Sequence, residues 1–197
     1  MCIRRFYMEE IIKRIETEVN NKITENFSEI EIAKLASKAE DLIDRKQIGE
    51  AHDLIGKMEK LNPDAEAVKC LKGYAFYMDG LLDESIPCFN DALRINPNNS
   101  KAKNLFEKAT KLDKLIKDSL EATKKNKDSE KALEFLNEAL TVDPANSKVN
   151  QTIYLQRSYH NYNLFNVTQA AIDFMKFQES GIKVSDLQVL IKDDPDA

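Results

Sequence analysis

The chain has 197 residues, of which 42% are hydrophobic and 32% charged, which suffices for a buried core and excludes a disordered protein. Five glycines and five prolines are too few for a fold built on many tight turns, so we expect an all-α protein. The net charge is −5, but residues 101–127 hold nine lysines against four carboxylates, which leaves about −10 on the remainder.

The N-terminal segment predicts one amphipathic helix of about sixteen residues. Its apolar residues recur every three or four positions, at Met8, Ile12, Ile15, Val19 and Ile23. Such a stripe is expected to pack on the end of the remaining structure. Ser28 and Glu31 have capping-box spacing, which predicts that another helix starts after them. Residues 1–31 are therefore expected to form a separate N-terminal capping helix.

A repeating unit is visible over residues 66–99. Its small, aromatic and proline residues have the spacing of a 34-residue pair of antiparallel helices, at Gly73, Ala75, Phe76, Gly80, Ser85, Phe89, Ala92 and Pro97. Small residues let the two helices approach closely, and the two phenylalanines fill the space between them. Gly80 supplies the turn, and Pro97 ends the second helix. Lys69 and Lys72 depart from the pattern, because it has tryptophan and leucine there.

The same period recurs upstream of this unit. Pro63 lies 34 residues before Pro97. Small and apolar residues ahead of it fall at the matching positions, at Ala39, Leu42, Ala51 and Ile55. A repeat over residues 32–65 is therefore expected in front of the clearest one.

Downstream, the next matching proline is Pro144, which lies 47 residues after Pro97. The additional residues are most simply placed in one long helix over about 101–125, a stretch without glycine or proline. A third repeat then spans residues 113–146. Three residues of its first helix are expected to face the second helix, namely Ile116, Leu120 and Thr123.

The pattern weakens beyond residue 149. Four residues fit a degenerate repeat over 151–184, at Tyr154, Ser158, Ala170 and Phe174. Phe177, however, stands where a small residue is expected. Residues 185–197 predict a short terminal helix and an acidic tail. We therefore expect a tetratricopeptide-repeat (TPR) array over 32–184, a right-handed superhelix of antiparallel helix pairs with one long helix in the middle.

The degenerate repeat is rich in aromatic residues. They are Tyr154, Tyr159, Tyr162, Phe165, Phe174 and Phe177. Core packing is the favoured interpretation of this cluster. The alternative is a docking patch for a partner, because aromatic side chains are favoured at the centres of protein interfaces.

Several other classes of function are not expected. Three cysteines without metal-ligand spacing indicate reduced thiols in a cytoplasmic protein, and the two histidines, His52 and His160, are far apart in the repeat plan. We expect no catalytic site, no metal and no cofactor, because the five glycines also form no phosphate-binding loop. No apolar run suggests a membrane span or signal peptide. The lysines of 101–127 surround the helix without interleaved aromatics, which argues against nucleic acid.

The order of two repeats, a lysine-rich long helix and a further helix pair resembles the TPR region of one family of J-domain co-chaperones, DnaJ subfamily C member seven. The segments that carry the resemblance are 91–97, 101–103 and 138–146. The resemblance implies a groove that grips the C-terminal carboxylate of Hsp70 or Hsp90 tails through basic side chains and asparagines. The His-Pro-Asp motif of the family's J domain is absent from this sequence, so stimulation of Hsp70 is not expected.

Transferred residue by residue, this clamp is degenerate. Lys117 matches its first lysine, but Glu121 replaces the first asparagine and would repel a terminal carboxylate. Gln156 keeps an amide in place of the second asparagine, while the last two basic positions fall near Asp186 and Leu190. Low affinity for EEVD-type tails is therefore expected. The candidate ligand-binding residues are Lys114, Lys117, Glu121 and Gln156.

Together these patterns predict a cytoplasmic scaffold, a co-chaperone-like adaptor that binds peptides or protein faces and catalyses nothing. Its expected partners are other proteins, including Hsp70- or Hsp90-type chaperones, and neither nucleic acid nor a membrane. The alternative is a structural subunit of a large cytoskeletal, ciliary or ribonucleoprotein assembly.

Overall fold

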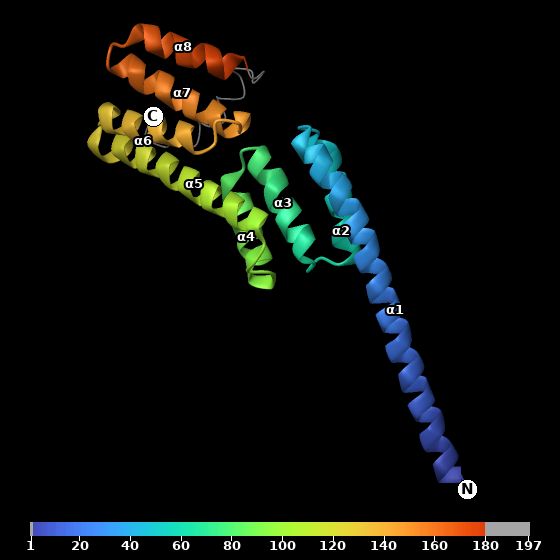
Figure 1. Cartoon of the computed structure of the whole chain (residues 1–197). Helices are drawn as coiled ribbons and strands as arrows, with labels where there is room; N and C mark the ends of the chain where they lie inside the picture. The colour runs from blue at the N-terminus through green and yellow to red at the C-terminus, as the bar shows by residue number, and fades with distance from the viewer. Residues whose placement is uncertain (1, 180–197) are drawn as a thin grey trace. The chain divides into compact units, whose positions relative to one another are not determined.

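The computed structural model describes residues 2–179 and places the side chains of residues 10–124 and 127–179. Every regular element in this part of the chain is an α-helix, which confirms the predicted all-α class. The chain divides into two compact units, residues 1–72 and 73–197. The boundary falls within helix α3 (Glu66–Met78). Figure 1 shows the helices in chain order.

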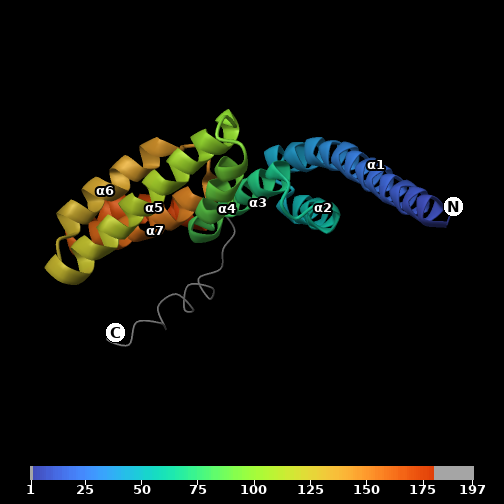
Figure 2. The ribbon, with the colours of Figure 1, turned by 90° about the horizontal axis from the view of Figure 1, so that it is seen from below.

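The first unit is built on α1 (Cys2–Asp44) and α2 (Ile48–Leu61). The two helices pack together through the C-terminal part of α1, and α1 extends far beyond α2 (Figures 1 and 2). The buried side chains are Ile32, Ala39 and Ile43 on α1, with Ala51, Ile55 and Met58 on α2. No helix within residues 2–179 is both long enough and apolar enough to cross a membrane.

The expectation of a separate capping helix over residues 1–31 is wrong. α1 continues without a break through Ser28 and Glu31, so this pair caps nothing, and Glu31 instead lies 3.8 Å from Lys34 one turn later. The physical reason is the absence of glycine and proline before residue 49, which leaves nothing to stop the helix. The apolar residues expected to pack on the array are exposed, Val19 by 49% and Ile23 by 61%.

As far as residue 179, the second unit contains the end of α3 and five further helices. They are α4 (Leu82–Ile95), α5 (Ser100–Asn126), α6 (Ser129–Val142), α7 (Ser147–Asn163) and α8 (Val167–Gln178). Each of α4 to α8 packs against the next in the chain, and α5, α6 and α7 lie side by side in both views (Figures 1 and 2). The long helix expected in the middle is α5, and its full length is free of glycine and proline.

Three turns share one geometry, which explains the spacing of the prolines. In each turn the residue before proline accepts a hydrogen bond, through its side-chain oxygen, from the N–H two residues later. The distances are 3.0 Å at Asn62, 3.1 Å at Asn96 and 3.2 Å at Asp143. Such an Asx turn stops one helix and orients the next. The recurring Asx-Pro pair is therefore the local signal that separates α2, α4 and α6 from the helices that follow them.

The second helix of each pair buries the same three positions. They are Ala51, Ile55 and Met58 in α2, Ser85, Phe89 and Ala92 in α4, and Ala132, Leu136 and Ala139 in α6. A spacing of four and then three residues puts them on one helix face. This common register produces helix pairs of similar geometry from different side chains.

The α7–α8 pair departs from that register. It buries Ala170, Asp173 and Phe177 on α8, so a carboxylate replaces an apolar side chain. Asp173 Oδ2 accepts from Asn161 Nδ2 at 3.0 Å and lies 3.4 Å from the Arg157 guanidinium. Hydrogen bonds and charge thus hold this pair together where the other pairs rely on apolar packing. The end of the repeat predicted over 151–184, and the helix and tail predicted over 185–197, lie outside the described residues.

Candidate functional site

The first candidate position, Lys117, lies on the second half of α5 between two carboxylates. Its Nζ is 2.8 Å from Asp113 Oδ1, one helical turn earlier, and 3.1 Å from Asp83 Oδ1 in the first turn of α4. The hydrogen bonds that Lys117 donates to Asp113 and then to Asp83 raise its pKa. Lys117 was expected to bind a terminal carboxylate, but Asp113 and Asp83 already compensate its positive charge. Its side chain nevertheless stays 59% exposed.

Gln156 of α7 meets α5 on a different side. Its Oε1 lies 3.1 Å from the hydroxyl oxygen of Ser119, a fully buried residue of α5. Two residues along a helix correspond to a rotation of about 200°, so Ser119 faces away from Lys117. The amide expected to join the clamp is instead part of the contact between α5 and α7.

His160 forms a second polar link between the same helices. Its Nε2 lies 3.2 Å from Thr123 Oγ1 of α5, and its Nδ1 lies 3.2 Å from Ser129 Oγ, the first residue of α6. Burial lowers the pKa of His160 from its usual 6.5, so the neutral ring fits this place with one nitrogen donating and the other accepting. His160 thus connects α5, α6 and α7, a role that its position in the sequence did not reveal.

The remaining candidates lie on the same side of α5 as Lys117. Lys114 and Glu121 are exposed and are three residues before and four residues after it, a spacing that places side chains on one helix face. The structure thus brings Lys114, Lys117 and Glu121 together and leaves Gln156 apart from them. The pairing of Lys117 with Asp83 and Asp113 was not predicted from the sequence. The 34-residue separation of Asp83 and Lys117, which equals one repeat period, could have suggested it.

Five of the six aromatic residues of the last helix pair form two sets, and the sixth, Tyr154, has the Lys176 ammonium 4.9 Å from its ring centroid. Phe177 is 2% exposed and its ring centroid lies 6.0 Å from that of Phe174, so these two pack within the pair. Tyr159, Tyr162 and Phe165 are among the exposed large hydrophobic residues, and Phe165 reaches 90% exposure. Core packing therefore explains only part of the cluster, and the exposed set has the composition of an interface centre.

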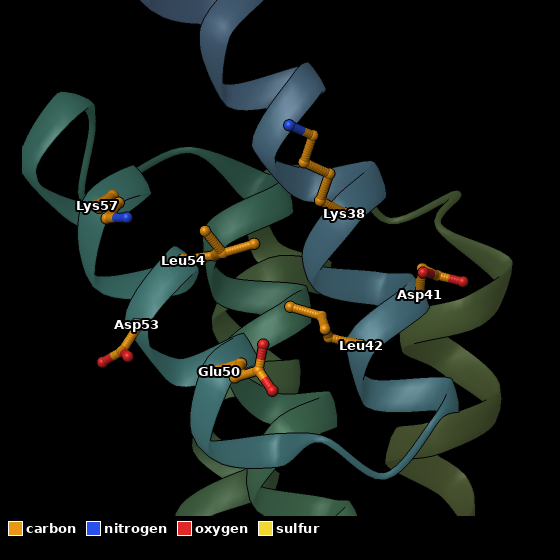
Figure 3. Close-up of a pocket in the computed structure, with 7 residues that line it drawn as sticks. All are labelled: Lys38, Asp41, Leu42, Glu50, Asp53, Leu54 and Lys57. Atoms are coloured by element: carbon orange, nitrogen blue, oxygen red, sulfur yellow. The ribbon is translucent and has the colours of Figure 1, made fainter.

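A further groove, which was not predicted, lies between α1 and α2 in the first unit (Figure 3). Its volume is about 430 Å³. Leu42 and Leu54 extend toward each other across it. Charged residues of both signs complete the lining, at Lys38, Asp41, Glu50, Asp53 and Lys57. This arrangement can accommodate an apolar side chain between the leucines, but it presents no convergent set of charges that would select an ion.

Comparison with known proteins fits this geometry. A family model for the tetratricopeptide repeat matches residues 66–99 and 121–146. A protein described as a DnaJ homolog subfamily C member 7 homolog, from Schizosaccharomyces pombe, is 29% identical over 108 residues. That alignment covers 55% of this chain and 22% of the yeast protein, so the chain matches about a fifth of its relative's length. This chain therefore contains tetratricopeptide repeats, and residues 66–99 and 121–146 are two regions where they are recognised.

Proposed function

We propose that the chain is a cytoplasmic protein–protein interaction adaptor that binds its partners without catalysing a reaction. The observation that carries the proposal is the pair of TPR matches at 66–99 and 121–146. Stacked helix pairs of this kind present extended surfaces to peptides or helices. The proposal is also supported by the partial similarity to a protein named for the DnaJ subfamily C member 7 family.

The adaptor is co-chaperone-like, but its clamp for Hsp70 or Hsp90 tails is degenerate. Three features support this: Asp83 and Asp113 compensate Lys117, Glu121 adds a negative charge on the same face, and Gln156 bonds to Ser119 elsewhere. A tail carboxylate would have to displace existing carboxylates from Lys117 and approach Glu121. Both steps reduce the net gain from binding.

The partner surface that fits best combines basic and aromatic residues. Lys124 is exposed on α5, and Tyr159 and Tyr162 are exposed on α7. The contact between Thr123 and His160 sets the C-terminal ends of these two helices beside each other. A lysine and two exposed tyrosines on these neighbouring helix ends suit a partner segment with acidic and apolar residues.

Affinity isolation with the full chain as bait tests this surface. We expect an exchangeable protein partner from native extract to bind the natural chain and to be lost with Tyr159→Ser combined with Tyr162→Ser. The matched control is Ile95→Ser combined with Ile172→Ser, which also removes two exposed apolar side chains. A partner retained equally by both variants contradicts the proposed surface, and a bait that retains no protein contradicts the adaptor function.

Peptides that end in the EEVD-type sequence test the clamp. We expect weak binding to the full chain and little further loss in Lys117→Ala, because that ammonium group already has two partners. Tight binding that is abolished by Lys117→Ala would contradict the degenerate clamp. It would instead assign the chain to the tail-binding co-chaperones.

A structural subunit of a large cytoskeletal, ciliary or ribonucleoprotein assembly is the second candidate. It is favoured by the apolar stripe on α1, whose residues are 49–70% exposed and would be stabilised by a permanent partner. Recovery of the chain in one large particle that survives high salt would favour this function over an exchangeable adaptor.

A further inference from the structure

The N-terminal part of α1 carries an apolar stripe that α2, its packing partner in the first unit, leaves exposed. Its residues are Ile12, Ile15, Val19, Ile23, Phe27 and Ile30. Their exposed fractions run from 49% to 70%. At 1.5 Å per residue the stripe is about 27 Å long. A continuous apolar row of this length on a helix surface marks an interaction site.

The stripe lies on the side of α1 opposite to α2. The α2-facing side of α1 is marked by its buried residues Ile32, Ala39 and Ile43. With about 100° per residue, Ile23 in the middle of the stripe is rotated by about 180° from Ile32. Packing of α1 on α2 therefore leaves the stripe accessible even where the two helices run together.

The spacing of the stripe is palindromic. From Ile12 to Ile30 the steps are three, four, four, four and three residues, with Asn21 at the centre. Two such helices placed antiparallel, with a twofold axis at Asn21, match every apolar residue with another. The matched pairs are Ile12 with Ile30, Ile15 with Phe27, and Val19 with Ile23.

We propose that α1 pairs antiparallel with α1 of a second copy of this chain through this stripe, with the twofold axis at the height of Asn21, whose own side chain lies on the other side of α1. Polar residues on the stripe obey the same symmetry: Glu16 falls opposite Asn26, whose amide can donate to the carboxylate. A polar layer that is satisfied only in one register fixes that register against slippage.

The flanking charges select the antiparallel orientation. Each basic residue on the sides of the stripe falls within about two residues of an acidic residue of the other copy on the same side. The pairs are Lys13 with Glu31 and Lys22 with Glu18, whereas Arg14 lies on the far side of α1, the side of Asn21. In a parallel pair in register, Lys13 would lie beside Lys13 of the other copy, and the acidic residues of 25–31 would lie beside the same acidic residues, so like charges would repel.

Ion pairs within one α1 helix do not prevent these charged residues from pairing with a second copy. Arg14 lies 3.6 Å from Glu18, and Lys34 lies 3.8 Å from Glu31, both one turn apart on the surface of α1. Exposed pairs of this kind are weak and rearrange readily. Covering the stripe in both copies removes on the order of 1,000 Å² of apolar surface from water, the lower range for a specific dimer.

Sedimentation equilibrium on the full chain tests the proposal. We expect a mass near 45 kDa, twice the 22.5 kDa of one chain, at tens of micromolar. Val19→Glu combined with Ile23→Glu should shift the mass to that of one chain, with unchanged helix content because both residues are exposed. The matched control is Thr17→Glu with Asn21→Glu, the same charge change and spacing on the other side of α1, which should leave the dimer intact.

A carbodiimide, which joins lysine amines directly to carboxylates, tests the orientation. We expect a cross-link between Lys13 and Glu31, which are about 27 Å apart along one helix and can meet only between two antiparallel copies. The proposal is overturned by a chain that stays monomeric, by a dimer unaffected by the glutamates at 19 and 23, or by a dimer lacking this cross-link. A monomer that sediments with phosphatidylserine vesicles would overturn it by assigning the stripe to a membrane surface.

Discussion

The ammonium group of Lys117 lies 3.1 Å from the carboxylate of Asp83, a residue one 34-residue repeat earlier in the chain. This contact links the first turn of α4 to the second half of α5. It also occupies the lysine that a tail-binding groove would need, with Asp113 2.8 Å from the same nitrogen atom. The ion pairing of Lys117 therefore both links α4 to α5 and determines whether this lysine can bind a terminal carboxylate.

Removing the two carboxylates should open the position. In Asp83→Asn with Asp113→Asn, the Lys117 ammonium loses both ionic partners, and its pKa should fall toward the ordinary lysine value. We expect affinity for a peptide ending in a free carboxylate to rise by about three- to tenfold at low salt and less at high salt. Fluorescence anisotropy with a labelled tail peptide measures the change.

The matched control is Asp91→Asn, which removes another α4 carboxylate, 3.5 Å from Arg94 on the same helix. It should leave peptide affinity unchanged. Equal gains in both variants would mean that net charge alone attracts the peptide, and no gain in either would remove Lys117 from the binding surface.

Replacing Gly73 or Gly56 by alanine should change the free energy of unfolding in opposite directions. A Cβ at Gly73 would lie 2.8 Å from the ring of Phe89, which is fully buried and cannot move aside. Gly73→Ala should therefore destabilise the protein by about 1–3 kcal/mol. Gly56→Ala meets nothing within 4 Å inside α2 and should stabilise its helix by ~0.5–1 kcal/mol. Urea unfolding followed by circular dichroism distinguishes them; the same sign for both would contradict the packing described here.

The buried carboxylate of α8 should be essential for the last helix pair. Asp173→Ala leaves the Arg157 guanidinium, which is 16% exposed, without its ionic partner, and it also removes the acceptor of Asn161. We expect a loss of ~3 kcal/mol in unfolding free energy. Adding Arg157→Met should recover part of it by removing the stranded charge. If the double variant is as unstable as Asp173→Ala, the ion pair is not the source of the loss.

The lowered pKa of His160 should make the stability of the folded chain depend on pH. Burial lowers its pKa in the folded state from 6.5, so the unfolded chain binds a proton at higher pH than the folded chain does. The stability from the neutral ring is complete above pH 6.5 and decreases as the pH falls from 6.5 through the folded-state pKa. Urea midpoints at about pH 7.5 and about pH 5.5 should differ more for the natural chain than for His160→Gln. An identical difference would assign the effect to other groups.

The TPR matches at 66–99 and 121–146 and the three helix-ending turns could be predicted from the sequence because their signals are local. Pro63, Pro97 and Pro144 each follow an Asx residue that closes the preceding helix by a side-chain hydrogen bond. The register inside the third repeat was predicted less well. Leu120 was expected to face the second helix but is 42% exposed, while its neighbour Ser119 is fully buried. A shift of one residue turns a helix by about 100°, and composition alone does not detect it.

The errors at the N-terminus and in the site have different causes. The stripe from Ile12 to Ile23 was correctly identified as helical, but periodicity does not say which surface will cover it. The capping-box spacing at Ser28 was misleading, because a capping motif acts only where the chain already breaks. The partners of Lys117 and His160 come from other helices, and only the packing of α4, α6 and α7 on α5 reveals them.

We propose that this chain binds protein partners without a working clamp for a terminal carboxylate. Calorimetric titration of the full chain with two versions of one EEVD-type peptide, a free acid and a C-terminal amide, tests it most directly. We predict affinities within about twofold of each other, because Lys117 is already paired and Glu121 opposes the added charge. A free acid that binds more than about tenfold tighter than the amide would contradict the claim.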